Sequence, residues 1–144
     1  LDAFAADFKA NVLDKALHPS LPPLQQLQSI VEHLYLRQQQ MHAQDCKVLG
    51  CPYGNIALEL GAQDETIRQY IDRKFQLFVA TIQTLIETAV RNGEFAPCDT
   101  HATAMAMFSF IEGVLLMAKT SNNPELIRTM GQAIVGMRIE STMS

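Results

Sequence analysis

Residues 64–93 have the sequence DETIRQYIDRKFQLFVATIQTLIETAVRNG, the most regular pattern in the chain. Apolar side chains recur at spacings of three and four residues from Ile67 to Val90, which is one face of a helix of about seven to eight turns. Asp64 is suited to cap the first turn, because its carboxylate accepts from free backbone N–H groups. Gly93 is suited to end the helix, because glycine adopts positive φ without strain. This stretch predicts one long amphipathic helix.

Downstream, residues 100–119 are apolar on nearly every side. A helix without a polar face must be covered all round, and we expect a second chain to cover part of this one. The run Asn123-Pro124-Glu125 then predicts the start of a last helix, which we expect to continue to about Ile139. Gly131 and Gly136 make that helix thin and permit the close approach of a neighbour.

Upstream, residues 1–17 carry a helical apolar stripe that includes Leu1, and a second helix is predicted from Pro22-Pro23 to about Met41. Glycine and proline interrupt the pattern within residues 43–53, and a short helix is predicted from Asn55 to Leu60. No stretch alternates with period two for long enough to form a strand. The sequence therefore predicts an all-α fold of about six helices, with residues 1–144 in a single domain.

The chain of 144 residues is 48% hydrophobic and carries a formal net charge of −4. This apolar content excludes disorder, and the acidic balance argues against nucleic-acid binding by this domain alone. Three cysteines are too few for a disulfide framework, and the chain shows neither a secretory signal nor an uncharged segment of membrane-spanning length. We expect a cytoplasmic protein without a membrane partner.

The chain opens on Leu1, which is not methionine, and enters a helical pattern without a capping residue. We therefore expect that it is part of a longer protein and that a functional domain precedes it.

Common enzyme motifs do not occur in the sequence. No glutamate is followed three positions later by histidine, which excludes the di-metal helical bundles, and neither a phosphate-binding glycine loop nor a nucleophile elbow is present. His42, Cys46 and Cys51 lie close in sequence but lack a fourth ligand, so ordinary loop residues are the favoured interpretation. We predict no catalytic residue, no cofactor and no metal site.

Two single residues require separate interpretation. Cys51 precedes a predicted helix, where a cysteine can have a lowered pKa and react with electrophiles, although a small buried apolar residue is the more common role. Glu112 is the one acidic residue in the apolar segment 100–119. A buried acid needs a partner or a raised pKa, so Glu112 is expected to meet a ligand, a second chain or solvent.

The order of these features resembles a known family. Residues 50–60, GCPYGNIALEL, followed by Asp64-Glu65 and the long helix, resemble the C-terminal domain of tetracycline-repressor (TetR) family transcriptional regulators. Residues 92–95, NGEF, followed by Asp99 and by FIEGVLLMAK at residues 110–119, resemble it too. The resemblance spans residues 22–139.

The resemblance implies a ligand-responsive repressor, of which this chain is the small-molecule-binding and homodimerisation part. Residues 1–18 would be the connector helix to an N-terminal helix-turn-helix domain that is absent from this chain, and DNA would be contacted only through that domain. The segments 102–119 and 124–139 would pair with those of a second subunit in a four-helix bundle. Its core would hold Gly113, Leu116, Met117, Ile127, Met130 and Ile134.

The resemblance also implies a pocket among the central helices for a small apolar or amphipathic effector. The candidate lining residues are Leu34, Tyr35, Gln38, Tyr53, Phe75, Phe78, Val79, Ile82, Met105, Phe108 and Glu112. Three alternatives stay open: an electrophile or redox sensor that uses Cys51 in the same architecture, a small α-helical enzyme, and a purely structural dimerisation module without a cavity.

Overall fold

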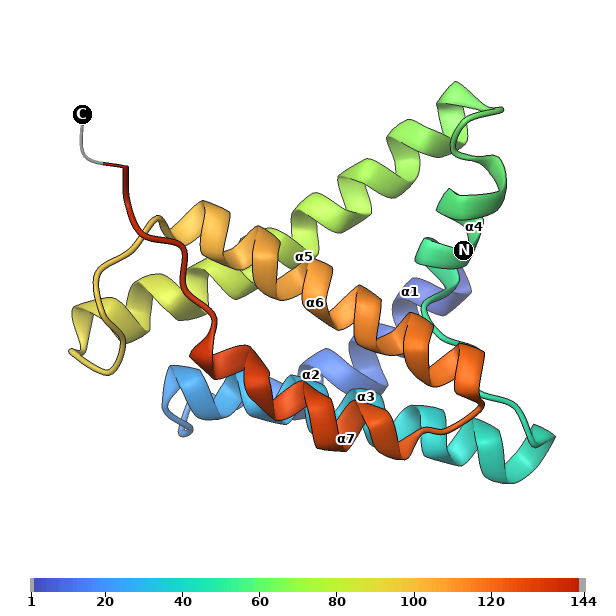
Figure 1. The fold of residues 1–144 in the computed structure, drawn as a ribbon, viewed down its shortest axis with the longest axis horizontal. Helices are drawn as coiled ribbons and strands as arrows, with labels where there is room; N and C mark the ends of the chain where they lie inside the picture. Colours follow the sequence, from blue (N-terminus) through green and yellow to red (C-terminus); the bar gives the residue numbers. More distant parts are fainter. Residues whose placement is uncertain (1, 143–144) are drawn as a thin grey trace.

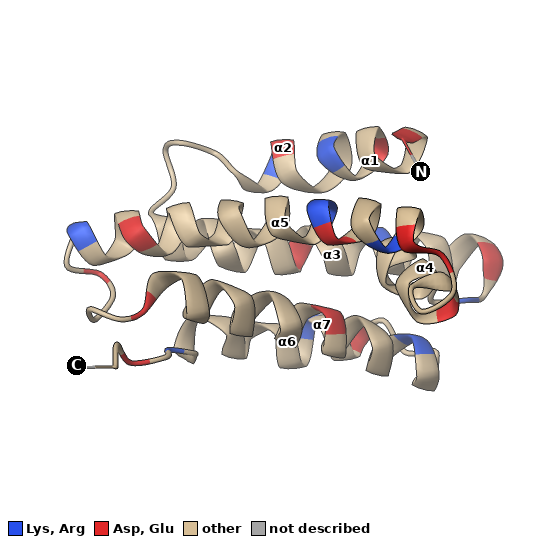
Figure 2. Ribbon diagram, turned by 90° about the horizontal axis from the view of Figure 1, so that it is seen from above, with Lys and Arg blue, Asp and Glu red and all other residues tan. Residues whose placement is uncertain are grey.

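The computed structural model describes residues 2–142, and no strand occurs among them, so the predicted all-α class is confirmed (Figure 1). The elements are α1 (Asp2–Phe8), the π-helical segment η1 (Lys9–Leu13), α2 (Asp14–Ala16), α3 (Pro23–Asp45), α4 (Pro52–Leu60), α5 (Glu65–Arg91), α6 (Thr100–Ser121), α7 (Glu125–Gly131) and the 3₁₀ segment η2 (Gln132–Gly136). Viewed from above, they form three layers: α1 to α2, then α3 with α5, then α6 with α7 (Figure 2).

The long helix α5 begins and ends where its sequence predicts. The side chain of Asp64 caps the helix and accepts a hydrogen bond from the backbone N–H of Ile67 at 3.0 Å. Gly93 follows the helix with φ of +73°, in the left-handed region that suits glycine. The apolar stripe from Ile71 to Ala89 is buried against α3 and α6.

Helix α6 is the apolar helix that the sequence predicts over residues 100–119. Asp99 caps it by accepting from the backbone N–H of Ala102 at 2.9 Å, and Asn122 ends it in the left-handed conformation with φ of +49°. Among the described helices, α6 alone has the length and hydropathy of a membrane span. One face of α6 nevertheless packs on α5 and α7, as a core helix does, while Leu116 and Met117 lie exposed on its outer face.

The first predicted helix is one helical run with an irregular middle. In η1 the backbone N–H of Asp14 donates to the carbonyl of Lys9, five residues earlier, which defines a π turn between α1 and α2. We call this run, Asp2–Ala16, the connector. It lies on α3, and the predicted member Leu1 falls outside the described residues (Figure 1).

The boundaries of the remaining helices differ from the prediction by a few residues. Helix α3 continues past Met41 to Asp45 and ends at Cys46, whose φ is +57°. Helix α4 begins at Pro52 rather than at Asn55, because the Sγ of Cys51 accepts from the backbone N–H of Gly54 and caps the first turn.

The prediction that the last helix continues to Ile139 is wrong. Helix α7 ends at Gly131, and after η2 the chain is extended and returns to the start of α6. There the backbone N–H of Ile139 donates to Thr103 Oγ1 at 3.0 Å, and its carbonyl accepts from the N–H of Asp99. These hydrogen bonds stabilise the extended course.

Gly131 is a point of close approach, as the sequence predicts. A Cβ atom at this position would lie well inside contact distance of Cγ1 of Val31 on α3, whereas a Cβ at Gly136 would meet no atom within 4 Å. The backbone of α7 therefore packs directly against α3 at Gly131.

Candidate functional site

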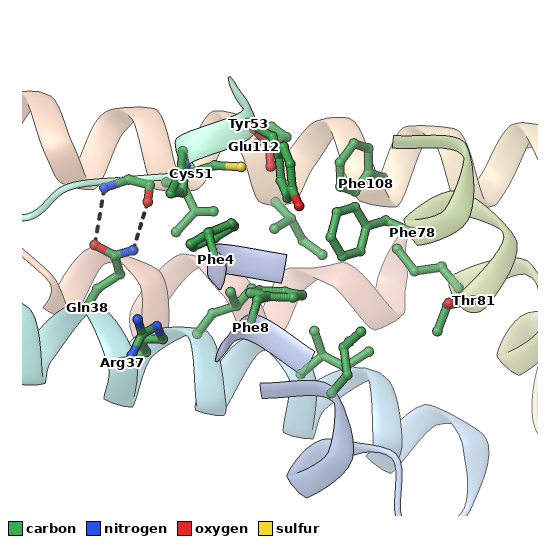
Figure 3. Close-up of a pocket in the computed structure, with 18 of the residues that line it drawn as sticks. Phe4, Phe8, Arg37, Gln38, Cys51, Tyr53, Phe78, Thr81, Phe108 and Glu112 are labelled. Carbon is green, nitrogen blue, oxygen red and sulfur yellow. Dashed lines mark hydrogen bonds between the residues drawn. The ribbon is translucent and has the colours of Figure 1, made fainter. Parts of the chain in front are cut away.

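The connector, α3, α4, α5 and α6 enclose an apolar cavity of about 60 Å³ (Figure 3). Its lining residues are Phe4, Phe8, Leu13, Ile30, Leu34, Arg37, Gln38, Met41, Gly50, Cys51, Pro52, Tyr53, Phe78, Thr81, Ile82, Phe108, Ile111, Glu112 and Leu115. Five of the lining residues are aromatic, and these five come from the connector, α4, α5 and α6.

Seven of the eleven residues predicted to line a pocket meet at this cavity. They are Leu34 and Gln38 of α3, Tyr53 of α4, Phe78 and Ile82 of α5, and Phe108 and Glu112 of α6. The helical period brings them together, because residues three and four positions apart share one face of a helix.

The other four predicted residues lie elsewhere. Val79 is buried in the core, Met105 is 45% exposed on the outer face of α6, and Phe75 lines a separate surface groove. Tyr35 faces α7, where its hydroxyl donates to the carboxylate of Glu125.

Tyr35 therefore serves the contact between α3 and α7. The guanidinium of Arg128 lies 4.0 Å from the centre of the Tyr35 ring, and Arg128 also pairs with Glu32 of α3. Because Tyr35 is one residue after Leu34, it lies about 100° further round the helix and points away from the cavity.

The connector supplies lining residues that the sequence alone does not identify. The ring of Phe4 meets that of Tyr53 edge to face, with centroids 5.2 Å apart, and Phe8 meets Phe78 in the same way at 5.1 Å. Phe78 in turn stacks on Phe108 at 5.7 Å. The apolar stripe predicts that Phe4 and Phe8 are packed, but it does not indicate which surface they pack on.

Arg37 lines the cavity and forms an ion pair with Asp7 of the connector. Its side chain is 21% exposed and that of Asp7 is 36% exposed. The positive charge of Arg37 is thus already matched within the chain.

Gln38 also lines the cavity, but its amide is bonded to the loop before α4. Its Nε2 donates to the carbonyl of Gly50 at 2.9 Å, and its Oε1 accepts from the backbone N–H of Gly50 at 3.1 Å (Figure 3). Its Oε1 also accepts from the backbone N–H of Leu49 at 3.1 Å. Since Gln38 is only 6% exposed, these bonds hold the loop from inside the fold.

Glu112 introduces a carboxyl group into this apolar surrounding. Burial raises its pKa, and no ion pair found among residues 2–142 includes it. Gly54 makes room for it, since a Cβ at position 54 would lie 2.5 Å from Glu112 Oε2. The carboxyl therefore lies against the backbone of α4 without a counter-charge.

Cys51 lies next to this carboxyl group. Burial, together with the nearby Glu112, raises the pKa of the Cys51 thiol to about 12. The thiolate is the reactive form of cysteine, so this environment does not favour the redox hypothesis. The sulfur acts instead as the cap of α4.

The hydroxyl of Tyr53 is buried and has no hydrogen-bond partner among the described residues. Burial and the neighbouring Tyr70 and Asp2 raise its pKa to about 12, so the hydroxyl stays protonated at neutral pH. A buried polar atom without a partner is unfavourable by about 1–3 kcal/mol unless a ligand or water satisfies it.

A metal site does not form in the part of the chain that the structure describes. No three His, Cys, Asp or Glu side chains within residues 2–142 lie close enough to share an ion, and His42, Cys46 and Cys51 make no such group.

A second hollow, of about 280 Å³, lies on the surface between α4, α5 and α6. We call it the outer groove, and it is lined by Gly50, Cys51, Gly54, Asn55, Ala57, Leu58, Phe75, Glu112, Gly113, Leu116 and Lys119. Glu112 and Cys51 line both hollows, so they lie in the wall between the cavity and the outer groove.

The residues predicted for a dimer core fall into two groups. Gly113, Leu116 and Met117 are exposed on α6, and Leu116 and Met117 are 51% and 53% exposed. Ile127 and Ile134 are only 2% and 0% exposed, because α7 and η2 turn them into the core of the single chain, and Met130 is partly buried against the same core.

Comparison with known proteins places this arrangement in a family. The family model described as "Tetracyclin repressor-like, C-terminal domain" matches residues 23–134, from the start of α3 into η2 and more than half of the chain. Neither the comparison with curated proteins nor that with solved structures gave a match.

Proposed function

Because the chain belongs to the family of tetracyclin repressor-like C-terminal domains, we propose that it is the effector-binding and homodimerisation part of a ligand-responsive transcriptional repressor. Domains of this family are regulatory rather than enzymatic, and the family supports a transcription regulator in general. The regulator would act in the cytoplasm and would contact DNA only through a helix-turn-helix domain joined to the connector.

The observation that carries the proposal is the position of the cavity directly under the connector. Phe4, Phe8 and Leu13 of the connector form one wall, and core helices form the others. A small apolar or amphipathic effector in the cavity would favour another position of the connector. The two helix-turn-helix domains of a dimer must match DNA half-sites about 34 Å apart, so a change in their positions would lower the affinity for the operator. The effector would act through the difference between its affinities for the two positions of the connector.

The experiment for effector binding is a thermal-shift screen of apolar and amphipathic molecules against the chain, repeated with the variant Thr81→Phe. Thr81 lines the cavity and is half-buried, so a phenyl ring there would fill the space. We expect stabilising molecules to lose their effect in this variant and to keep it in Thr84→Phe, one turn along α5 on the exposed surface. A screen in which both variants respond like the parent would contradict an effector site in the cavity.

The proposed dimer uses the outer face of α6. Met105, Leu116 and Met117 are large apolar side chains exposed on this helix, and Gly113 lies between them on the same face. Exposed apolar side chains gathered on one face indicate an interaction surface. Because Ile127 and Ile134 are committed to the core of the single chain, α6 would supply most of the contact.

Light scattering on the purified chain tests the dimer. Gly113→Arg introduces a long charged side chain where a Cβ meets no atom within 4 Å, so the single chain tolerates it while a helix packed on this face does not. We expect a dimer for the parent and a monomer for Gly113→Arg. Leu77→Arg, which changes an exposed leucine of α5, is the matched control and should remain dimeric. A parent chain that stays monomeric at high concentration would contradict this part of the proposal.

A further inference from the structure

We infer that the effector of this cavity is an aromatic cation whose ring takes the place of the connector side chains Phe4 and Phe8 and whose positive group pairs with Glu112. The inference rests on the proposed function, because it assumes that the cavity is an effector site. It adds the chemical class of the effector and names the side chains that must leave the cavity before the effector can bind.

The size of the cavity requires that something moves. A volume of about 60 Å³ is far below the roughly 300–1,000 Å³ of pockets that hold drug-sized ligands. On α3, α5 and α6, half of the twelve lining residues are buried, namely Ile30, Leu34, Gln38, Ile82, Ile111 and Leu115, whereas none of the lining residues of the connector is buried. Helix α1 contains no buried residue, and Phe4 and Phe8 are only partly buried. The connector side chains are therefore the part of the wall that is least costly to displace.

The contacts that Phe4 and Phe8 would vacate suit an aromatic ring. Each makes an edge-to-face contact, Phe4 with Tyr53 and Phe8 with Phe78, at centroid distances of 5.2 and 5.1 Å. An entering aromatic ring can make the same contacts, which are favourable beyond the area they bury. A flexible aliphatic chain would fill the space without them.

The polar groups of the lining favour a positive charge on that ring. Arg37 is paired with Asp7, the amide of Gln38 is bonded to the loop, and the hydroxyl of Thr81 donates to the carbonyl of Leu77 at 3.0 Å. The Cys51 thiol and the Tyr53 hydroxyl stay neutral, because the pKa of each is raised to about 12, and Glu112 is the carboxyl group of the lining, without a counter-charge among the described residues.

Surrounding aromatic faces add to this preference, because the negative face of a ring attracts a cation. Phe78 and Phe108 line the same cavity as Glu112 (Figure 3). A carboxylate on the effector would instead meet Glu112 while Arg37 is occupied. The site thus selects cations over anions of the same shape.

The test uses three naphthalene derivatives of the same shape and different charge: naphthalene-2-carboxamidine, 2-naphthamide and 2-naphthoate. The chain contains no tryptophan, so naphthalene fluorescence reports binding to the 144-residue protein directly. We expect the amidine to bind about tenfold more tightly than the amide, and the naphthoate to bind most weakly. Equal or tighter binding of the naphthoate would overturn the assignment of charge.

The variant Phe8→Ala tests the displacement. If Phe8 occupies the place of the effector, its removal raises the population of the open state and tightens amidine binding, by about tenfold. If Phe8 is an ordinary wall residue, its removal weakens binding of all three compounds, and the displacement is refuted. Phe95→Ala, a partly buried phenylalanine remote from the cavity, should leave the three affinities unchanged.

The variant Glu112→Gln tests the pairing. We expect the affinity for the amidine to fall to that for the amide, while the amide affinity stays the same. A second readout needs no variant: burial raises the pKa of Glu112 and pairing with an amidinium lowers it, so binding releases protons at pH values between the pKa of the free state and that of the bound state, a range that a pH series covers. Calorimetry in two buffers of different ionisation heat measures that release, and its absence would refute the pairing.

These outcomes are distinguishable from a failure of the proposed function. If none of the three compounds binds to the parent or to Phe8→Ala, the inference is wrong. The screen with Thr81→Phe and the light scattering of Gly113→Arg then decide separately whether the cavity takes another effector and whether the chain is a dimer.

Discussion

Arg37 of α3 and Asp7 of α1 form an ion pair that joins the connector to the wall of the cavity. Asp7 Oδ2 is a buried atom that has no hydrogen bond in addition to this pairing. Among the ion pairs of the described residues, this is the one that joins the connector to α3.

Removal of the positive partner should loosen the connector. In Arg37→Met the buried oxygen of Asp7 has no counter-charge, and we expect a loss of about 1 kcal/mol, since the pair is partly screened by solvent. Hydrogen exchange of the amides in Asp2–Ala16 should then be about fivefold faster. Lys9→Met, which removes the exposed pair between Lys9 and Asp14, is the control. Similar exchange rates in the two variants would contradict a special role of Arg37.

The loop before α4 should depend on Gln38. Gln38→Met keeps the length of the side chain but removes the hydrogen bonds to Leu49 and Gly50. Because these backbone groups are then left with fewer partners, we expect the free energy of unfolding to fall by about 2–3 kcal/mol in urea denaturation. Gln39→Met, on the exposed face of the same helix, should change it by less than about 0.5 kcal/mol. A loss of the same size in both variants would mean that the helix and not the loop is affected.

The contact of α7 with α3 should tolerate no side chain at position 131. Gly131→Ala places a methyl group against Val31 Cγ1, and we expect a loss of about 1–3 kcal/mol from overpacking. Gly136→Ala has open space and should be neutral or stabilising by a few tenths of a kcal/mol. In the double variant Val31→Ala/Gly131→Ala the loss should be smaller than the sum of the single losses. Additive losses in this double-mutant cycle would show that the two positions do not clash.

The free energy of unfolding should depend on pH in a way that Glu112 determines. Burial raises the pKa of this carboxyl group in the folded chain. The groups that face it are the Cys51 thiol, the backbone at Gly54 and, across the outer groove, Lys119, which donates to Asn55. A raised pKa means that the folded chain binds the proton more tightly than the unfolded chain does. The stabilisation is therefore fully present below the unfolded pKa of about 4.3 and is lost as the pH rises through the folded pKa.

Urea denaturation at a series of pH values measures this effect. The free energy of unfolding of the parent should fall, relative to Glu112→Gln, as the pH rises from about 4 toward neutrality. Glu59→Gln, on the exposed surface of α4, should retain the pH dependence of the parent. A constant difference between the parent and Glu112→Gln over this range would show that the carboxyl is not buried.

Local signals in the sequence predict much of the fold. The Asp64 cap, the stripe of α5 and Gly93 each act within a few residues, and the structure has all three in place. The end of α7 was not predictable in this way. It depends on hydrogen bonds between Ile139 and residues about forty positions earlier, Asp99 and Thr103, which leave no local pattern.

The sequence predicts part of the candidate site, because the helical period decides which residues share one face of a helix. The period correctly groups Leu34 with Gln38 and Phe108 with Glu112, because each pair is four residues apart on one face. It does not show which face meets which neighbour. Tyr35 was therefore predicted to line the cavity but contacts α7. Phe4 and Phe8 line the cavity although the sequence does not specify the surface on which their segment packs.

The π turn in η1 changes the angular position, about the helix axis, of the connector residues that precede it. A π turn holds one residue more than an α turn, so the chain before Lys9 is rotated by about 100° relative to a helix continued without interruption from Asp14. Phe4 and Phe8, which line the cavity, lie in the rotated part. If η1 were converted to α-helix, Phe4 and Phe8 would turn by this angle about the helix axis relative to Asp14–Ala16, and anything attached ahead of Asp2 would turn with them. A change between π and α geometry in η1 would therefore rotate the start of the connector about its own axis.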